Sequence, residues 1–170
     1  MLTSAFNAVL RLGLRLVYPI VCRAERVLGI ETEVATVAVW HDGAVLMIRN
    51  SYRSQLTLPG GHIGTGESAV AAAVRELHEE AGVRIDAADV RPAYAETVLW
   101  DRRRDRCAIF ETVLTDRPAV RIDNREVVWA DFLPAAEALA ANPTPHVRAY
   151  LERRRDTNAP PPIDPDPSAT

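Results

Sequence analysis

The segment from Gly61 to Val83 constrains the fold of this chain more than any other stretch. In its second half, between Ser68 and Ala81, apolar residues recur at steps of three and four, which predicts a helix with one buried face. Ser68 is a residue type that caps helix N-termini, and Gly82 suits the left-handed position after a last helical turn. We therefore expect a helix over 68–81 that packs by one face. The residues of that face are Val70, Ala73, Val74, Leu77 and Ala81.

Three carboxylates are expected on the other face of this helix, because Glu76, Glu79 and Glu80 stand at i, i+3 and i+4. Taken alone, such a cluster is most simply a solvated helix face. The preceding loop, 58–66, has four glycines, which allow close approach of the backbone to a ligand, and the N–H groups of a helix start favour anions. Since a hard divalent cation bridges carboxylates to phosphate oxygens, the combination favours a metal-assisted phosphate site.

The spacing of the fixed residues in this segment matches a known pattern. Gly61 is followed after five residues by Glu67 and after seven more by Arg75–Glu80, which reads R-E-L-H-E-E and continues as A-G-V. Residues 61–83 therefore resemble a complete Nudix box, G-x5-E-x7-R-E-U-x-E-E-x-G-U with U aliphatic, and the chain resembles the Nudix hydrolase superfamily. The resemblance implies a hydrolase with Mg²⁺ or Mn²⁺ as cofactor, in which water activated by the metal attacks phosphorus in a pyrophosphate bond.

The resemblance also implies roles for single residues of the box. The expected metal ligands are the carbonyl of Gly60 and the carboxylates of Glu76, Glu79 and Glu80. The expected catalytic residues are Arg75, Glu76 and Glu79. Arg75 is expected to orient a neighbouring glutamate by a charge-assisted hydrogen bond. Glu76 is the candidate general base, with a glutamate from a later loop as the alternative. Structural roles are expected for Gly61, Glu67 and Gly82, and Gly61 also borders the substrate.

Other candidates lie outside the box. Many Nudix enzymes place a further metal-binding or basic glutamate near a later strand, and Glu126 is the expected residue here, with Asp123 and Glu111 as competitors. Arg49 and Arg53 flank a segment that lies near the substrate mouth in similar Nudix proteins. Because a guanidinium suits phosphate, we expect these two arginines to bind substrate, with ordinary surface use as the alternative.

Several residues have a structural and a functional interpretation. The arginines of the segment 101–106 are most simply part of a solvated, salt-bridged turn, and contact with a substrate phosphate is the alternative; they are Arg102, Arg103, Arg104 and Arg106. Trp100 and Tyr94 are expected in the core, although their rings are also of a kind that stacks on a nucleobase. His62 and His78 stand at variable positions of the box, so we expect both to face solvent.

The rest of the domain is expected to alternate strands and helices. Expected strands are 33–40, 44–49, 55–58, 94–100, 107–114 and 126–132, and expected helices are 134–141 and 146–155. His41-Asp42-Gly43 supplies a hairpin turn between the first two strands. Strands on both sides of a central helix, with helices after them, predict an α/β fold, an α/β/α sandwich with a mixed sheet. This Nudix-like domain is expected over 31–155, and the resemblance covers 34–139.

Composition bounds the class of protein. The chain has 170 residues, which is most simply one domain, and its formal net charge of −3 does not support a DNA-binding surface. Cys22 and Cys107 form no C-x-x-C or metal-binding pattern, so we expect reduced thiols in a cytoplasmic protein. Residues 156–170 are rich in proline and poor in large apolar residues, which predicts a disordered tail.

Residues 1–30 form an N-terminal segment whose stretch 2–22 is apolar but interrupted by Arg11, Arg15 and Pro19. The two arginines make a membrane-spanning helix costly, and no cleavage-site pattern indicates a signal peptide. We expect an amphipathic helix that packs on the domain or on a second copy of the chain in a homodimer. Weak binding to a membrane surface is the alternative.

The substrate implied by the resemblance is a nucleoside diphosphate linked to another moiety. An oxidised or noncanonical nucleoside triphosphate and the 5′-triphosphate end of an RNA are two versions of it, which the sequence does not rank. The alternative function is a Nudix-like module that binds a nucleotide or a partner without turnover. Such modules typically lose box carboxylates, whereas this chain keeps all four box glutamates and Arg75.

Overall fold

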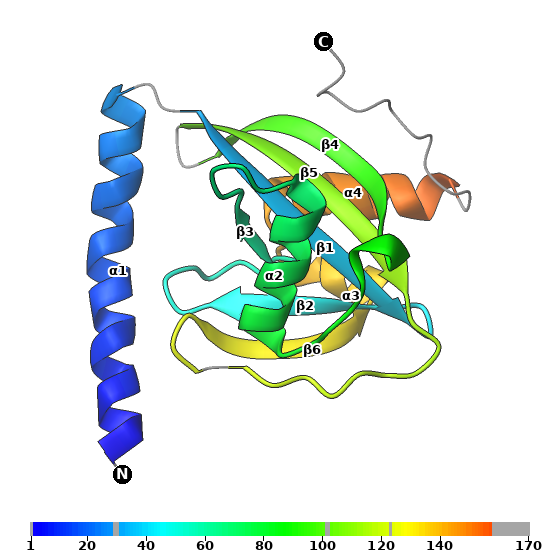
Figure 1. Ribbon diagram of the computed structural model, residues 1–170, viewed down its shortest axis with the longest axis horizontal. Helices are drawn as coiled ribbons and strands as arrows, with labels where there is room; N and C mark the ends of the chain where they lie inside the picture. The colour runs from blue at the N-terminus through cyan, green and yellow to red at the C-terminus, as the bar shows by residue number, and fades with distance from the viewer. Residues whose placement is uncertain (1, 29–30, 101–102, 123, 158–170) are drawn as a thin grey trace.

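The computed structural model describes residues 2–28, 31–100, 103–122 and 124–157 of the chain. A sheet forms the middle layer of a three-layer domain, with α2 (Ala69–Ala81) on one face and α3 (Ala135–Ala140) and α4 (Pro145–Thr157) on the other (Figure 1). The long helix α1 (Leu2–Leu28) runs beside this domain. The α/β/α sandwich expected from the sequence is confirmed.

The sheet has six strands in the order β4-β5-β1-β2-β6, and β3 pairs with β1. β1 and β5 run parallel, whereas the other neighbouring strands are antiparallel, so the sheet is mixed as expected. The strands are β1 (Thr32–His41), β2 (Ala44–Asn50), β3 (Gly60–His62), β4 (Arg91–Trp100), β5 (Arg103–Val113) and β6 (Val127–Pro134), and the short 3-10 helix η1 (Ala87–Asp89) precedes β4.

The hairpin expected between the first two strands is confirmed. Trp40 of β1 pairs with Val45 of β2, and the turn residues Asp42 and Gly43 have φ angles of 50° and 74°. A type I′ turn requires positive φ at both central residues, and an Asp-Gly pair accepts it at little cost. The turn therefore aligns β1 and β2 from local chemistry alone.

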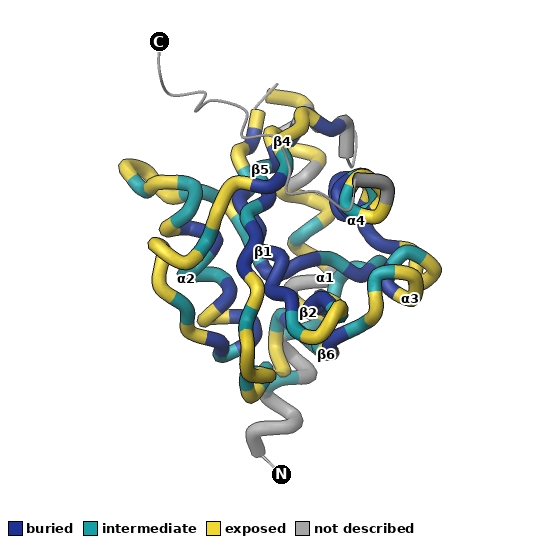
Figure 2. The backbone as a smooth tube through the Cα atoms, turned by 90° about the vertical axis from the view of Figure 1, so that its right-hand side faces the viewer, coloured by how far each residue is buried: buried dark blue, intermediate teal, exposed yellow. Residues whose placement is uncertain are grey.

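Alternation along β1 divides the core into two parts. Val37 and Val39 are fully buried on the face covered by α2, whereas Ala38 and Trp40 are buried on the face covered by α4. β1 is thus buried along most of its length, at the centre of the molecule (Figure 2). A strand that is covered on both faces gives the neighbouring loop and helix of the box a rigid support.

Two predictions of secondary structure were wrong. The segment 55–58 makes only single bridges, at Leu56 and Thr57, and the strand that enters the box is β3. The expected loop over 101–106 is largely the beginning of β5, because this strand pairs with β1 and with β4 from its first residues onward. Two sheet neighbours thus outweigh a local run of charges that is typical of a turn. Arg106 accordingly lies on a strand, where it forms an exposed ion pair with Glu33 (3.2 Å).

The N-terminal helix is longer than the expected 2–22, because α1 continues past Pro19 to Leu28. Within the described residues, no helix is long and apolar enough to cross a membrane. Some residues named above lie outside the described part of the chain: Arg102, Asp123, the tail from 158 onward, and the side chains of Arg15, Cys22, Trp100, Arg103 and Arg104.

Candidate functional site

The box helix α2 has the caps that the sequence predicts. Ser68 accepts a hydrogen bond at Oγ from the Ala71 N–H (3.3 Å). Gly82 has a φ of 67°, a left-handed conformation that favours glycine, and donates its N–H to the carbonyl of His78. The buried residues of the helix are Ala72, Ala73, Leu77, Glu80 and Ala81. The expectation that all three clustered glutamates share an exposed face is therefore wrong for Glu80.

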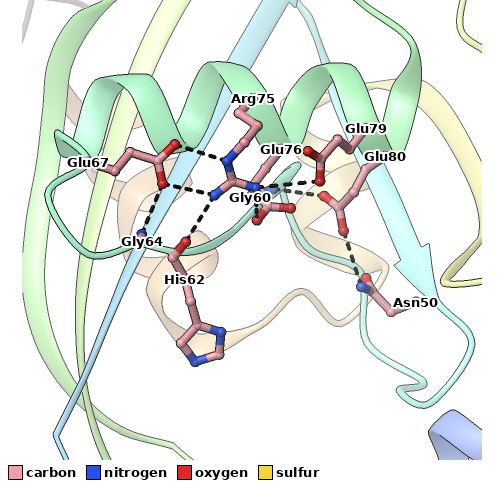
Figure 3. A network of polar contacts seen from close by, with 9 residues as sticks. All are labelled: Asn50, Gly60, His62, Gly64, Glu67, Arg75, Glu76, Glu79 and Glu80. Atoms are coloured by element: carbon pink, nitrogen blue, oxygen red, sulfur yellow. Dashed lines mark hydrogen bonds and ion pairs between the residues drawn. The ribbon is translucent and has the colours of Figure 1, made fainter.

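Arg75 organises the carboxylates of the box (Figure 3). Its Nε and Nη2 donate to the two oxygens of Glu67 at 2.9 and 3.0 Å. Its Nη1 donates to Glu76 at 2.7 Å and to Glu79 at 3.4 Å. The hydrogen bonds from Arg75, together with one from the Gly64 N–H, lower the pKa of Glu67. Glu67 thus ties the glycine loop to the helix, and Arg75 fixes the neighbouring carboxylates in place.

Gly61 leaves room for the carboxylate of Glu76. A Cβ added at residue 61 would lie 2.5 Å from Glu76 Oε1, closer than any real contact. The side chain of Glu76 is 18% exposed, and its burial raises its pKa, while the hydrogen bond from Arg75 lowers it. Any side chain at position 61 would displace Glu76 from the face of the loop, which gives a physical reason for glycine there.

Glu80 is the most deeply buried acid of the box, at 7% exposed. Its Oε2 accepts a hydrogen bond from the Gly60 N–H at 2.8 Å, and its Oε1 accepts one from Asn50 Nδ2 at 3.4 Å. Both donors are neutral. Burial raises the pKa of Glu80 well above its ordinary value, and the nearby Glu126 and Glu76 raise it further. A buried carboxylate with neutral donors and acidic neighbours is a favourable place for a bound cation.

Gly60 itself has no space for a side chain. A Cβ at this residue would lie 2.4 Å from the Ala35 carbonyl oxygen and 2.5 Å from Thr36 Cα, both backbone atoms of β1. The glycine therefore lets β3 approach β1 closely and brings its own N–H to Glu80. The predicted metal ligand Gly60 is thus part of the same cluster as Glu80.

Asn50 and Tyr52 connect Glu80 to Glu126. Asn50 Nδ2 donates to the Tyr52 hydroxyl (3.1 Å) as well as to Glu80, and the Tyr52 hydroxyl donates to Glu126 Oε1 (2.7 Å). Sequence analysis missed both residues as members of the site. A signal was present, since Asn50 is a polar residue at the end of the apolar run of β2, and it is buried. The chain brings Glu126 to the box through this polar link.

An aromatic cluster lies next to this link. The ring of Tyr18 from α1 stacks on Tyr52, with centroids 4.4 Å apart. The Arg53 guanidinium carbon lies 4.9 Å from the Tyr18 centroid and 5.7 Å from that of Tyr52. The predicted substrate-binding Arg53 is thus held over aromatic rings beside the site. The other predicted arginine, Arg49, is exposed on β2.

The remaining candidates lie away from the cluster. Glu111, the competitor of Glu126, is fully buried on the opposite side of the sheet and is bonded to Arg91 and Arg154, so it is not part of the site. Tyr94 packs against the core near α4, as expected, and its hydroxyl donates to Glu96 (2.6 Å). His62 and His78 are both exposed, which confirms that prediction.

The donor chemistry of the site fits a hard divalent cation. Among the described residues, no group of three or more acidic, histidine or cysteine side chains is spaced as a ready metal cage, since the glutamate oxygens lie on Arg75, Gly60 and Asn50 instead. All the side-chain ligands expected from the sequence are nevertheless oxygen donors, as Mg²⁺ and Mn²⁺ prefer. Asn50 Oδ1 is buried beside Glu80 and has no hydrogen-bond partner in the described part of the chain. An ion with its water shell would satisfy this acceptor and offset the charge of Glu80.

Comparison with known proteins gives a family match over most of the chain. The model of the NUDIX domain matches residues 31–154, which include the whole site. No curated protein sequence matches the chain.

Solved structures share the fold at low sequence identity. An Ap4A hydrolase from C. elegans superposes with a TM-score of 0.63 at 16% identity, covering 74% of this chain and 96% of that one. The E. coli ORF135 protein gives 0.63 at 22%, covering 79% and 95%. A bifunctional NMN adenylyltransferase/ADP ribose pyrophosphatase from Francisella tularensis, complexed with AMP and a Mn ion, gives 0.67 at 13%, covering 85% of this chain and 48% of that protein.

Proposed function

The chain belongs to the Nudix family, and on that premise we propose that it is a metal-dependent hydrolase of a pyrophosphate bond in a nucleoside diphosphate linked to another moiety. The observation that carries the proposal is the surroundings of Glu80. This box glutamate is buried among neutral donors and close to other carboxylates, while the complete set of box residues is retained. A module that had lost catalysis would have no reason to keep so costly an arrangement.

Mg²⁺ or Mn²⁺ would be held by oxygen donors of the box together with Glu126. The proposed ligands are Glu76, Glu79, Glu80, Glu126 and the carbonyl of Gly60. The bound metal supplies positive charge where negative charge develops at phosphorus.

The chain's own residues position this chemistry. Arg75 holds Glu76 through a 2.7 Å hydrogen bond, and Gly61 leaves the space that Glu76 occupies. We assign Glu76 as the group that accepts the proton of the attacking water, because it faces the glycine loop where the substrate phosphates would lie. Arg53 and Arg49 are the proposed contacts to the substrate phosphates.

The substrate has to be found by testing classes of compound. An oxidised nucleoside triphosphate and an RNA 5′-triphosphate end are proposed substrates. Because the fold resembles an Ap4A hydrolase and an ADP ribose pyrophosphatase, a dinucleoside tetraphosphate and ADP-ribose belong in the same panel. Mass spectrometry of products formed in ¹⁸O-labelled water would identify the substrate and the phosphorus that is attacked.

Three variants test the site once a substrate is known. Glu79→Gln and Glu80→Gln remove expected ligands, and we expect strongly reduced Mg²⁺-dependent turnover from both. Glu137→Gln is the matched control, since Glu137 is an exposed glutamate in the first turn of α3, away from the box. Equal turnover in all three variants would overturn the proposed metal site. Nucleotide binding without turnover of any compound would favour the binding module instead.

A further inference from the structure

Helix α1 turns an apolar face away from the domain. Among the described residues, eight large hydrophobic side chains are exposed, and seven of them lie on α1. They are Leu12, Leu16, Val17, Ile20, Val21, Val27 and Leu28, and the eighth is Val113 of β5. A contiguous apolar surface of this kind marks an interaction site on a soluble domain.

Among the described side chains of α1, Arg11 and Tyr18 contact the domain. Arg11 Nε donates to the Asn124 carbonyl at 2.9 Å, and Tyr18 stacks on Tyr52. An amphipathic helix ordinarily buries its apolar face on its own domain. Here the seven large apolar side chains named above are exposed instead, and Figure 1 shows α1 as a separate column at the side of the sandwich. The apolar face is therefore available to a partner.

The charge of the chain distinguishes between two kinds of partner. α1 contains four arginines and one glutamate, which gives it a formal charge of +3. Because the whole chain has a formal charge of −3, the rest of the chain carries −6. Pairing two copies through α1 would bring like charges together. Seating α1 on another copy would place its apolar face against the rest of that chain, which has a formal charge of −6 and where, in the described residues, Val113 is the one large exposed hydrophobic. A second copy of the chain is thus a poor occupant.

An anionic lipid surface suits both properties of the helix. Its acyl region takes up apolar side chains, and its headgroups attract arginines. Arg23 borders a shallow hollow together with Ile20, Val27 and Leu28, so its stem lies along the apolar face. Arginines in such positions keep the stem in the apolar region and extend the guanidinium to phosphate.

We propose that α1 is a surface anchor that lies in the plane of an anionic bilayer, with its apolar face in the headgroup–acyl boundary and the catalytic domain on the aqueous side. The anchor is in direct contact with the site, because Tyr18 of α1 stacks on Tyr52, which bonds Glu126. Binding to lipid would therefore place the mouth of the site next to the membrane.

The test is co-sedimentation of the full chain with vesicles of phosphatidylcholine, with or without about one-third phosphatidylglycerol, at about 0.05 and 0.5 M salt. We expect several-fold stronger binding to the anionic vesicles, weakened at high salt. The double variant Leu16→Glu/Ile20→Glu should lower binding by roughly tenfold or more, because two buried apolar side chains are lost. Val113→Glu is the matched control and should bind as the wild type does.

A second measurement does not depend on charged substitutions. Leu16→Trp places a fluorophore on the apolar face, and anionic vesicles should shift its emission to the blue, with quenching by brominated acyl chains. Circular dichroism of each variant confirms that the domain is folded.

Three outcomes would overturn the proposal. The first is no binding to anionic vesicles by the wild type. The second is vesicle binding that the double variant retains in full. The third is a dimer, detected by light scattering, that the double variant dissociates while vesicles bind neither protein; a second copy would then cover α1.

Discussion

Glu80 and Glu111 are both buried carboxylates, but they lie on opposite sides of the sheet and have different partners. Glu111 is fully buried and accepts hydrogen bonds from Arg91 (2.7 and 3.0 Å), Arg154 (2.5 Å) and the Tyr150 hydroxyl (2.8 Å). Glu80 accepts hydrogen bonds from a backbone amide and a side-chain amide. Two arginines neutralise the charge of Glu111, whereas no arginine in the described part of the chain pairs with Glu80.

This difference separates a structural acid from a site acid. The arginines on Glu111 come from β4 and α4, and Tyr150 also accepts a hydrogen bond from Trp40, so the network locks α4 onto the sheet. A buried charge without a counter-ion costs several kcal/mol, and a cation bound at Glu80 would offset that cost. The partners of a buried glutamate, rather than its burial, therefore indicate whether its role is structural or functional.

The largest expected effect comes from removing the charge of Glu80. Glu80→Gln should lower Mg²⁺-dependent turnover by about 10³-fold, as expected when a group that stabilises the transition state is lost. The free energy of unfolding in the absence of metal should be unchanged or higher, because an amide costs less to bury than a carboxylate. Turnover assays and urea denaturation measure the two quantities. A destabilised but active variant would show that Glu80 has a structural role, as Glu111 has.

Glu111→Gln should have the opposite profile. We expect it to lower the free energy of unfolding by about 3 kcal/mol, because Arg154 and Tyr150 lose a charged partner inside the protein. Turnover per folded molecule should stay close to the wild-type value, since Glu111 is on the far side of the sheet. Urea denaturation gives the stability, with Glu137→Gln as the exposed control. No loss of stability would show that the network does not hold α4.

We expect a divalent metal to stabilise the protein through Glu80 and not through Glu111. At a concentration about 100 times the dissociation constant, Mg²⁺ should add about 2.7 kcal/mol to the free energy of unfolding of the wild type. The same addition is expected for Glu111→Gln and should be absent for Glu80→Gln. Thermal unfolding with a series of Mg²⁺ concentrations measures this stabilisation, with chelator-treated samples that lack divalent metal as the reference. Equal stabilisation of all three proteins would locate the ion elsewhere.

Acid should weaken the layer that contains α4 through His146. Burial lowers the pKa of His146 to about 4, and the repulsion of Arg53 contributes. Between this value and the ordinary pKa of about 6.5, the unfolded chain binds a proton that the folded protein does not. The free energy of unfolding contributed by His146 therefore falls as the pH falls, by about 2 kcal/mol between pH 7 and 5.

The measurement for His146 is a difference between two proteins. The buried box glutamates have raised pKa values and act in the opposite direction, since a folded protein that holds a proton on them gains stability as the pH falls. Subtracting the pH dependence of His146→Gln from that of the wild type isolates the histidine. Identical curves for the two proteins would contradict the prediction.

The sequence predicted those parts of the site that depend on local spacing. Ser68 and Gly82 cap α2 as expected, and Arg75 contacts the glutamates that stand beside it in the helix and the loop. The contact of Asn50 with Glu80 is different, because it joins the end of β2 to a helix residue 30 positions later through tertiary packing. No local period encodes such a contact, so the polar Asn50 after an apolar run pointed to a polar site but not to its partners Glu80 and Tyr52.

The errors in the fold have the same origin. β5 begins earlier than the charge pattern indicates because it has two sheet neighbours, and the strand expected at 55–58 has too few partners to form. For α1, the periodicity showed that one face is apolar but carried no information on what that face contacts. The sequence therefore predicted which elements form better than it predicted what each element contacts.

The parallel pairing of β1 with β5 bears on the order in which the chain assembles. Thr32 pairs with Asp105, so the whole box must be synthesised before β1 can pair with β5. Contacts at such sequence separations slow folding, because a long loop has to close before they form. During synthesis, the half of the protein that carries the glutamates consequently emerges with one apolar strand edge uncovered, and the later half completes it.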